Sequence, residues 1–382
     1  MEHPRRNIAP SHPISKENFM KSTRYLVAAP AALALALAGC GGSTGTTDTP
    51  AASGASSAAG APADDSNCAD AEVFCVGLVT DTGKVDDKSF NQSAHEGAQA
   101  AAEETQGFYK YVETQDAKDY ASNIAQFTNK KYDVLITVGF LMTDATVKAA
   151  TENPQTRFIG VDQGYDPKKV TTKNVTGLIF PEDQAGYGAG YLAGLMTKTN
   201  KLGQVLGLQI PPVEKFAKGF EAGAKAANPA VSVTTVYHPA ADNAFNDPVW
   251  GAGEAKKQLA QGADVIFGAG GNTGNGALQE VAKTAGAGTD KFCIGVDTDQ
   301  WDTVPAAQPC LVTSAMKLIN EGVTDTVVQA KDGDFTELQT LGKAGLAPYH
   351  DFESVVPADV KAKVEDVVTQ MEAGTLKTGV TL

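Results

Sequence analysis

Short apolar runs alternate with amphipathic, alanine-rich segments along the chain from residue 73 to residue 296. The apolar runs predict strands at 73–79, 133–138, 158–161, 175–180, 203–208, 231–237, 264–268 and 292–296. The segments between them predict helices at 91–105, 144–151, 184–198, 214–227, 250–261 and 274–286. Strands that are apolar throughout and alternate with helices indicate parallel sheets that are buried on both faces. The strands are too many for one simple sheet, so we expect an α/β fold with two similar units.

Polar residues or glycines follow the carboxyl ends of several predicted strands. These residues are Thr80 and Asp81, Gly139 and Phe140, Asp162 and Gln163, Gly268 to Gly271, and Asp297. Parallel α/β sheets bind their ligands at the carboxyl ends of the strands. The recurrence of such residues therefore predicts a binding cleft at this edge.

The first 67 residues carry targeting signals and a linker. An apolar run at 26–38 follows a basic segment, and at this length it is too short to span a bilayer. It ends in Leu37-Ala38-Gly39-Cys40, which resembles the bacterial lipobox. We therefore expect a signal peptide at 1–39, starting at Met1 or Met20, and lipidation of Cys40. The Gly-, Ser-, Thr-, Ala- and Pro-rich segment 40–67 predicts a flexible tether, so the protein is expected to be extracytoplasmic and lipid-anchored to the cell membrane.

The chain is strongly acidic once the signal peptide is removed. Residues 40–382 hold 26 basic and 43 acidic residues, a net charge of −17. Such a surface repels nucleic-acid phosphates, so no nucleic-acid partner is expected, and membrane contact is expected through the lipid anchor only. The acidity also argues against a strongly anionic ligand such as a nucleotide.

Cysteine usage fits an oxidising compartment. If Cys40 carries lipid, Cys68, Cys75, Cys293 and Cys310 remain, and four cysteines allow three pairings. The local pairing, Cys68 with Cys75 and Cys293 with Cys310, is preferred, and the other two stay open. No CxxC spacing occurs, so we expect no zinc or redox site.

The segment DDKSFNQSAHEG at 86–97 places an aromatic residue among polar ones at the start of a helix. Ser89 or Asn91 is expected to cap this helix. Phe90, beside Asp86, Asp87 and Lys88, offers a flat apolar face suited to a planar heterocycle. The alternative is that Phe90 belongs to the core.

Motifs for catalysis or nucleotide binding are missing from the sequence. The glycine-rich segment GAGGNTGNG at 268–276 contains neither GxGxxG nor a following GK[ST]. The five histidines are dispersed, and neither GxSxG nor HExxH occurs. We therefore expect no catalytic residues, no metal site, no cofactor and no enzymatic activity.

Seven segments together resemble one family. They are VGLVTDTGKVDDKSFNQSAHEG (76–97), GVDQ (160–163), YLAGLMTKTNKLGQVLG (191–207), KFAKGFEAGAKAANP (215–229), FNDPVWGAGEAKKQLAQGADVIFGAGGNTGNGAL (245–278), IGVDTDQ (294–300) and LVTSAMK (311–317). In this order they are similar to the basic membrane protein family of ABC-transporter binding lipoproteins, which includes purine nucleoside receptors. The resemblance covers nearly all of the mature chain.

The resemblance implies a type I periplasmic-binding-protein fold, in which two doubly wound parallel-sheet lobes are joined by three crossing segments. The crossings are expected near Phe180, near Leu311 to Ser314, and near 335. They divide the chain into an N-terminal lobe (68–181 plus 313–335) and a C-terminal lobe (182–312 plus 336–382).

The resemblance also implies a set of ligand-binding residues. Two phenylalanines would sandwich a base, and the matching positions are Phe90 and Phe216, with Phe220 as the alternative to Phe216. Asp162 would read the base edge together with Asn91. A ribose would be held by Asp297, Lys317 and the backbone of Gly270, with Asp87 and Lys88 nearby. The turn GLQIPPVEKF departs from the glycine pair of many relatives, which affects the expected pose of Phe216.

We therefore expect a binding protein that delivers a nucleoside, in particular a purine nucleoside, to the permease of an ABC importer. The first alternative keeps the fold and changes the ligand to a sugar, a vitamin or a signalling molecule. An enzyme on an α/β scaffold and a surface adhesion lipoprotein are further alternatives.

Overall fold

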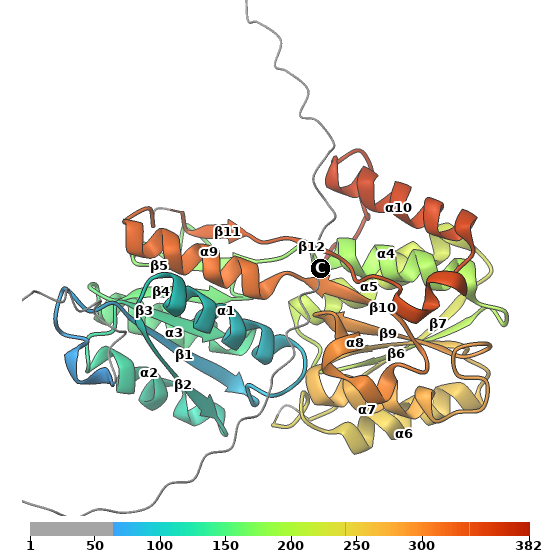
Figure 1. Cartoon of the computed structure of the whole chain (residues 1–382), viewed down its shortest axis with the longest axis horizontal. Coiled ribbons are helices and arrows are strands. Elements are labelled where there is room, and N and C mark those ends of the chain that lie inside the picture. Colours follow the sequence, from blue (N-terminus) through green and yellow to red (C-terminus); the bar gives the residue numbers. More distant parts are fainter. Residues whose placement is uncertain (1–63, 241, 336) are drawn as a thin grey trace, which may run out of the picture. The chain divides into compact units, whose positions relative to one another are not determined.

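The computed structural model describes residues 64–382 except residues 241 and 336. The predicted signal peptide, Cys40 and most of the predicted tether lie outside the described residues. Within the described part, two six-stranded sheets are each covered by helices on both faces (Figure 1). The predicted α/β class with two parallel-sheet lobes is confirmed.

The first sheet, in the N-terminal lobe, has all its strands parallel, in the order β11-β5-β4-β3-β1-β2. Its strands are β1 (Cys75–Thr82), β2 (Phe108–Thr114), β3 (Val134–Val138), β4 (Arg157–Val161), β5 (Val175–Ile179) and β11 (Gln339–Leu341). Its helices are α1 (Phe90–Glu104), α2 (Tyr120–Thr128), α3 (Thr143–Glu152) and α9 (Ile319–Asp332). One apolar core joins α1 and α9 to the sheet, and a second core joins α2 and α3 to its other face.

The second sheet, in the C-terminal lobe, has the order β12-β10-β9-β8-β6-β7, and only β12 runs antiparallel to its neighbour. Its strands are β6 (Lys201–Leu206), β7 (Ser232–Tyr237), β8 (Val265–Ala269), β9 (Phe292–Asp297), β10 (Leu311–Lys317) and β12 (Ala344–Leu346). Its helices are α4 (Glu182–Met196), α5 (Pro211–Ala227), α6 (Pro248–Ala260), α7 (Gly271–Ala282), α8 (Gln300–Thr303) and α10 (Ala358–Glu372).

The chain passes between the lobes three times, and two of the passages lie later than expected. β5 ends at Ile179 and α4 begins at Glu182, which puts the first passage at Phe180. The second was expected near Leu311 to Ser314, but β10 pairs with β9 as far as Met316 opposite Asp297, so all of β10 belongs to the second lobe. The third was expected near 335, but β11 pairs with β5 in the first lobe. The second and third passages therefore fall at Leu318 and at 342–343.

The N-terminal end of the described chain is fastened to the first lobe. Asp64 caps a short 3-10 helix at Asp65–Asn67, where the predicted tether was expected to continue. The carboxylate of Asp65 pairs with Lys110 at 3.2 Å and with Lys130 at 2.7 Å. A disulfide then joins Cys68 to Cys75, the first residue of β1.

The second disulfide joins Cys293 in β9 to Cys310, which directly precedes β10. Both sulfur pairs therefore follow the local pattern. Cys293 and Cys310 are fully buried, so their bond lies inside the second lobe.

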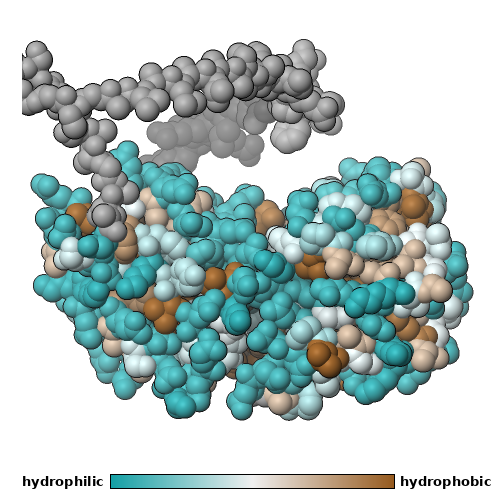
Figure 2. All heavy atoms as spheres, turned by 60° about the horizontal axis from the view of Figure 1, so that its bottom comes forward, coloured by the Kyte–Doolittle hydropathy of each residue, from teal (hydrophilic) through white to brown (hydrophobic). Residues whose placement is uncertain are grey.

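The surface face drawn in Figure 2 is largely hydrophilic, and hydrophobic residues appear on it in small separate groups. This agrees with the acidic composition of the chain. None of the helices between residues 64 and 382 is long and apolar enough to cross a membrane.

Candidate functional site

A cavity of about 560 Å³, including its open mouth, lies between the two lobes. Its wall is built from the carboxyl ends of β1, β3 and β4 in the first lobe and of β8, β9 and β10 in the second, together with the starts of α1 and α5. Ligand sites of α/β proteins typically lie between domains and at the carboxyl ends of the strands. The edge that the sequence predicted as a cleft is therefore hollow in the structure.

The structure brings together eight of the nine residues predicted to contact a ligand. The eight that line the cavity are Asp87, Phe90, Asn91, Asp162, Phe216, Gly270, Asp297 and Lys317. Lys88 is the exception, because its side chain is exposed and does not line the cavity. Its backbone is left-handed, with φ of 62°, and its carbonyl accepts hydrogen bonds from the second lobe.

The turn before α1 is organised by Asp87. Its carboxylate accepts hydrogen bonds from the backbone N–H groups of Ser89, Asn91 and Gln92 at 2.9–3.1 Å. Ser89 is the N-cap residue of this helix, as expected, but its side chain makes no capping hydrogen bond, and Asn91 lies inside the helix. The hydroxyl of Ser89 instead donates to Asp297 of the second lobe at 2.8 Å.

A buried lysine joins the two lobes at the floor of the cavity. Lys317, the last residue of β10, places its Nζ 2.6 Å from Oδ2 of Asp162 and 3.4 Å from Oδ1 of Asp297. Asp162 and Asp297 directly end or follow strands in a left-handed conformation, with φ of 61° and 67°. All three side chains are less than 10 % exposed. A buried charge of this kind requires paired partners, and the two carboxylates supply them.

Of the residues that the structure describes, four aspartates line the cavity, whereas Lys317 is the one lysine in its wall. Burial raises the pKa of three of these aspartates. Burial, reinforced by the charges of Asp87 and Asp162, raises the pKa of Asp81 to about 7. Burial also raises the pKa of Asp87 to about 6, although the three N–H groups that its carboxylate binds oppose the shift. Burial likewise raises the pKa of Asp162, and Lys317 opposes it. Burial lowers the pKa of Lys317, but the surrounding carboxylates more than offset this, so its pKa is raised and it remains cationic.

One further carboxyl group lies just behind the cavity. Glu182 begins α4 at the first passage between the lobes, and its side chain is 2 % exposed. It pairs with Lys215 at 3.1 Å. Burial and the charge of Asp162 raise its pKa to about 7. The cavity floor thus continues into a buried charge network at the hinge.

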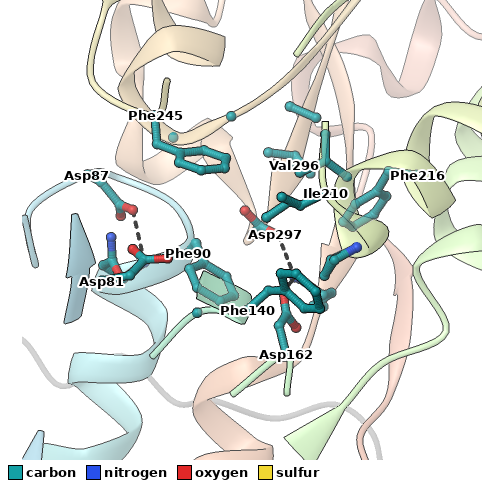
Figure 3. Close-up of a pocket in the computed structure, with 18 residues that line it drawn as sticks. Asp81, Asp87, Phe90, Phe140, Asp162, Ile210, Phe216, Phe245, Val296 and Asp297 are labelled. Atoms are coloured by element: carbon teal, nitrogen blue, oxygen red, sulfur yellow. Dashed lines mark hydrogen bonds and ion pairs between the residues drawn. The ribbon is translucent and has the colours of Figure 1, made fainter. Parts of the chain in front are cut away.

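Aromatic rings face the cavity from both lobes. Phe90 and Phe140 project into it from the first lobe, and Phe245 projects from the opposite side (Figure 3). Phe216 lines the far end, where its ring centroid lies 5.5 Å from Nζ of Lys317. A flat apolar ligand therefore has aromatic faces available on both sides.

Phe216 and Phe220 also belong to the core of the second lobe. Phe216 is 3 % exposed and packs edge-on against Phe267, with ring centroids 6.2 Å apart. Phe220 is fully buried and stacks on Phe267 at 5.1 Å, and it does not line the cavity. Phe220 is thus a core residue, which removes it as the alternative to Phe216.

Phe245 is a cavity residue to which the sequence analysis gave no role. It lies in the loop between β7 and α6, and its ring packs so closely on Gly207 that an added Cβ there would be 2.3 Å from it. The sequence marks Phe245 only by its position, because it is an aromatic residue two positions before Asp247. Asp247 caps α6 by accepting a hydrogen bond from the backbone N–H of Trp250. Asp81 and Phe140 were recognised as strand-end residues but likewise had no assigned role.

Two acceptor atoms at the cavity have no hydrogen-bond donor among the described residues. Oδ1 of Asn91 and Oδ1 of Asp162 are buried, and among the described residues neither has a hydrogen-bond partner. Buried polar atoms are normally satisfied, so these two oxygens favour a ligand that carries N–H or O–H groups. Within residues 64–382 as described, no cluster of His, Cys, Asp and Glu could hold a metal ion.

Comparison with known proteins agrees with this geometry. The family model described as ABC transporter substrate-binding protein PnrA-like matches residues 74–340. The CD4+ T-cell-stimulating antigen of Listeria innocua is 34 % identical over 342 residues, which cover 84 % of this chain and 93 % of the relative. The ABC transporter nucleoside-binding protein BmpA of Lactococcus lactis is 33 % identical over 272 residues, which cover 68 % of this chain and 75 % of the relative.

The fold also has counterparts among solved structures. An ABC transporter solute-binding protein of Aeropyrum pernix K1 superposes with a TM-score of 0.72, at 23 % sequence identity, and covers 80 % of this chain and 92 % of its own. At this identity the likeness concerns the fold, which is the predicted type I periplasmic-binding-protein fold.

Proposed function

Because the chain belongs to the PnrA-like family of ABC transporter substrate-binding proteins, which are receptors rather than enzymes, we propose that the small molecule it binds is a purine nucleoside. The observation that carries this proposal is the combination of aromatic faces from both lobes with unpartnered acceptor oxygens at the cavity. A purine presents flat π-faces and N–H donors at its edge. A ribose presents hydroxyls, which carboxylates bind through charge-assisted hydrogen bonds.

Two groups of cavity residues suit the two halves of a nucleoside. Phe90 and Phe245 offer ring faces from opposite sides of the cavity (Figure 3), and Asn91 and Asp162 carry the unpartnered acceptor oxygens. Asp297, Lys317 and the backbone of Gly270 are also in the wall, and Nζ of Lys317 lies 4.5 Å from the ring centroid of Phe90. We assign the first group to the base and the second to the ribose. The relative from Lactococcus lactis, named as nucleoside-binding, supports a nucleoside as the ligand by similarity.

The charge of the cavity favours a neutral ligand over a phosphorylated one. Asp81, Asp87, Asp162 and Asp297 line it, against the single cation of Lys317, whose Nζ already contacts two of them. A 5′-phosphate would place negative charge among these carboxylates. We therefore expect a nucleoside monophosphate to bind at least roughly 100-fold more weakly than its nucleoside.

Calorimetric titration of the full chain carrying Cys40→Ser tests the proposal. The ligands are inosine, guanosine, adenosine, cytidine, guanine, ribose and inosine monophosphate. Purine nucleosides should bind most tightly, the free base more weakly, and the monophosphate more weakly still. Asp297→Asn should weaken nucleosides more than the free base, whereas Asp359→Asn, at an exposed position on α10, should leave both unchanged. If the protein binds ribose but none of the nucleosides, its ligand is a sugar and the nucleoside proposal is wrong.

We also propose that Cys40 carries the lipid that holds the protein at the membrane. The lipobox resemblance and the apolar run before it support this. Cys40→Ser should release the protein from washed membranes of the expressing bacterium, whereas Cys293→Ala should not. A Cys40→Ser variant that stays with the membrane after detergent-free washing contradicts the anchor.

A further inference from the structure

The second lobe donates hydrogen bonds to the backbone carbonyls of the turn at Asp87 and Lys88, and the donor residues lie outside the cavity. Nδ2 of Asn275 donates to the carbonyl of Asp87 at 2.8 Å. Nε2 of Gln300 and Oγ1 of Thr303 donate to the carbonyl of Lys88 at 3.2 and 2.8 Å. None of the three donor residues is among the residues that line the cavity in the described part of the chain.

Two of the three donors, Gln300 and Asn275, are held in place by the second lobe itself. Oε1 of Gln300 accepts the backbone N–H of Val296 at 3.0 Å, and its Nε2 also donates to Oδ1 of Asn275 at 2.7 Å. The backbone N–H of Gln300 is bound by the hydroxyl of Ser314 at 3.1 Å. These bonds lie within one lobe, so they persist whether or not the first lobe is present. Preorganised donors bind without a large ordering cost.

The acceptors on the first lobe are equally fixed. Asp87 ties the turn to the start of α1 through three backbone N–H groups. Lys88 adopts the left-handed conformation, and its carbonyl takes two donors from the second lobe. The carboxylate of Asp87 lines the cavity while its carbonyl faces Asn275, so one residue touches both the ligand space and the contact between the lobes.

We propose that Asn275, Gln300 and Thr303, together with the carbonyls of Asp87 and Lys88, form a closure latch. The latch stabilises the closed arrangement of the lobes independently of ligand contacts and thereby sets how slowly a bound ligand leaves. Opening the lobes breaks all three bonds at once, together with the Ser89–Asp297 bond and the Lys317–Asp162 bridge at the cavity. Thr303 and Gln300 are thus affinity-determining residues that the ligand does not touch. The latch does not depend on the ligand being a nucleoside.

Thr303→Val is the sharpest variant, because it removes one donor from a surface position and keeps the side-chain volume. Thr289→Val is the matched control. Thr289 lies in the same lobe and is exposed, but its hydroxyl donates to Gly286 within that lobe. Lys88→Ala is a second control, because it removes the side chain and leaves the carbonyl that the latch uses.

Double electron–electron resonance measures the distance between two spin labels and therefore reports how the lobes are arranged. One label is attached at Glu103→Cys on α1 in the first lobe and the other at Lys256→Cys on α6 in the second lobe, and both positions are exposed. The background is the full chain with Cys40→Ser, without ligand. The parent chain should show a closed population, and Thr303→Val should deplete it, whereas Thr289→Val and Lys88→Ala should not. Dissociation of inosine in stopped flow should be roughly three- to ten-fold faster for Thr303→Val alone.

Two results would overturn the latch. One is a parent chain with no closed population in the absence of ligand. The other is a Thr303→Val distance distribution that matches that of Thr289→Val. The distance measurement needs no ligand, so a failure of inosine to bind would count against the nucleoside proposal and would not affect the test of the latch.

Discussion

Nζ of Lys317, on the last residue of β10, lies 2.6 Å from Oδ2 of Asp162, which follows β4 in the other lobe. Their side chains are 3 % and 6 % exposed. A lysine of one lobe is therefore neutralised by a carboxylate of the other, deep in the cleft and next to Phe180 at the first passage between the lobes.

Removing the lysine should destabilise the fold strongly. Lys317→Met leaves Asp162 and Asp297 buried without their cation, and breaking a buried pair typically costs about 3–5 kcal/mol. Urea denaturation should show a loss of this size in the free energy of unfolding. Adding Asp162→Asn should recover part of it. The control is Lys363→Met, which breaks the exposed pair with Asp359 and should cost less than about 1 kcal/mol. Equal losses for the two lysine variants would contradict the buried bridge.

Asp81 should make the protein less stable as the pH rises toward neutrality. Burial raises the pKa of its folded form to about 7, above the ordinary value near 3.8. The folded state therefore holds this proton more tightly, and the stability it contributes is full below pH 4 and lost as the pH passes 7. Between pH 5 and pH 8 this amounts to roughly 2–3 kcal/mol in the free energy of unfolding.

The measurement is urea denaturation at pH 5, 6, 7 and 8. Asp81→Asn should reduce the decline by this amount and stabilise the protein at pH 8, and the remaining decline comes from Asp87 and Glu182, whose pKa values burial raises to about 6 and about 7. Asp359→Asn, at a surface carboxylate whose pKa is lowered by Lys363, should leave the decline intact. If Asp81→Asn keeps the full slope between pH 5 and pH 8, another group causes it.

The aromatic residues should separate into ligand faces and core. Phe90→Ala and Phe245→Ala should each weaken nucleoside binding about ten-fold, because stacking on a base is worth roughly 1–3 kcal/mol. Their free energies of unfolding should fall less than that of Phe216→Ala, which empties a core position and should lose about 3–5 kcal/mol. Calorimetry and urea denaturation measure the two effects. Tyr111→Ala, at an aromatic residue that is 41 % exposed, serves as the control for both.

The disulfide between β9 and β10 should stabilise the second lobe. Cys293 and Cys310 are 17 residues apart, and closing a loop of that length contributes about 3 kcal/mol in the chain-entropy description. Replacing both with alanine should lower the free energy of unfolding by this amount. Unreduced peptide mapping of protein exported by its bacterial host should recover the two cysteines in one linked peptide. Recovery of both as free thiols would show that the bond does not form.

The regular elements were predictable because most of the strands contain a short run of apolar residues and most of the helices between them are rich in alanine. The predicted runs correspond to β1 and to β3 through β9, and the six predicted helices to α1 and α3 through α7. β2 was missed because Lys110, Glu113 and Thr114 interrupt its apolar residues and because it lies at a half-exposed edge of the sheet. β11 and β12 have three residues each and carry no pattern, so the third passage between the lobes was out of reach of the sequence.

The cavity residues likewise include some whose place could be predicted from the sequence and others whose place could not. Asp162 and Asp297 stand where a strand ends, so their position follows from the periodicity of the strand. Phe245 stands in an irregular loop, and its place in the cavity depends on packing against Gly207, which only the folded chain brings near. Lys88 was misassigned because its neighbours on both sides line or support the cavity, whereas the left-handed turn directs its carbonyl to the second lobe.

The fastening of residues 64–75 to the first lobe has a mechanical consequence. A pull on the chain at residue 64 passes from Cys68 through the sulfur bridge directly into Cys75, at the start of β1, and the ion pairs of Asp65 spread the load to β2 and the end of α2. β1 is flanked by β2 and β3, so the force is shared across the first sheet. The three passages between the lobes lie outside this path. Tension on the N-terminal end is therefore borne by one lobe alone, and the other remains free to swing.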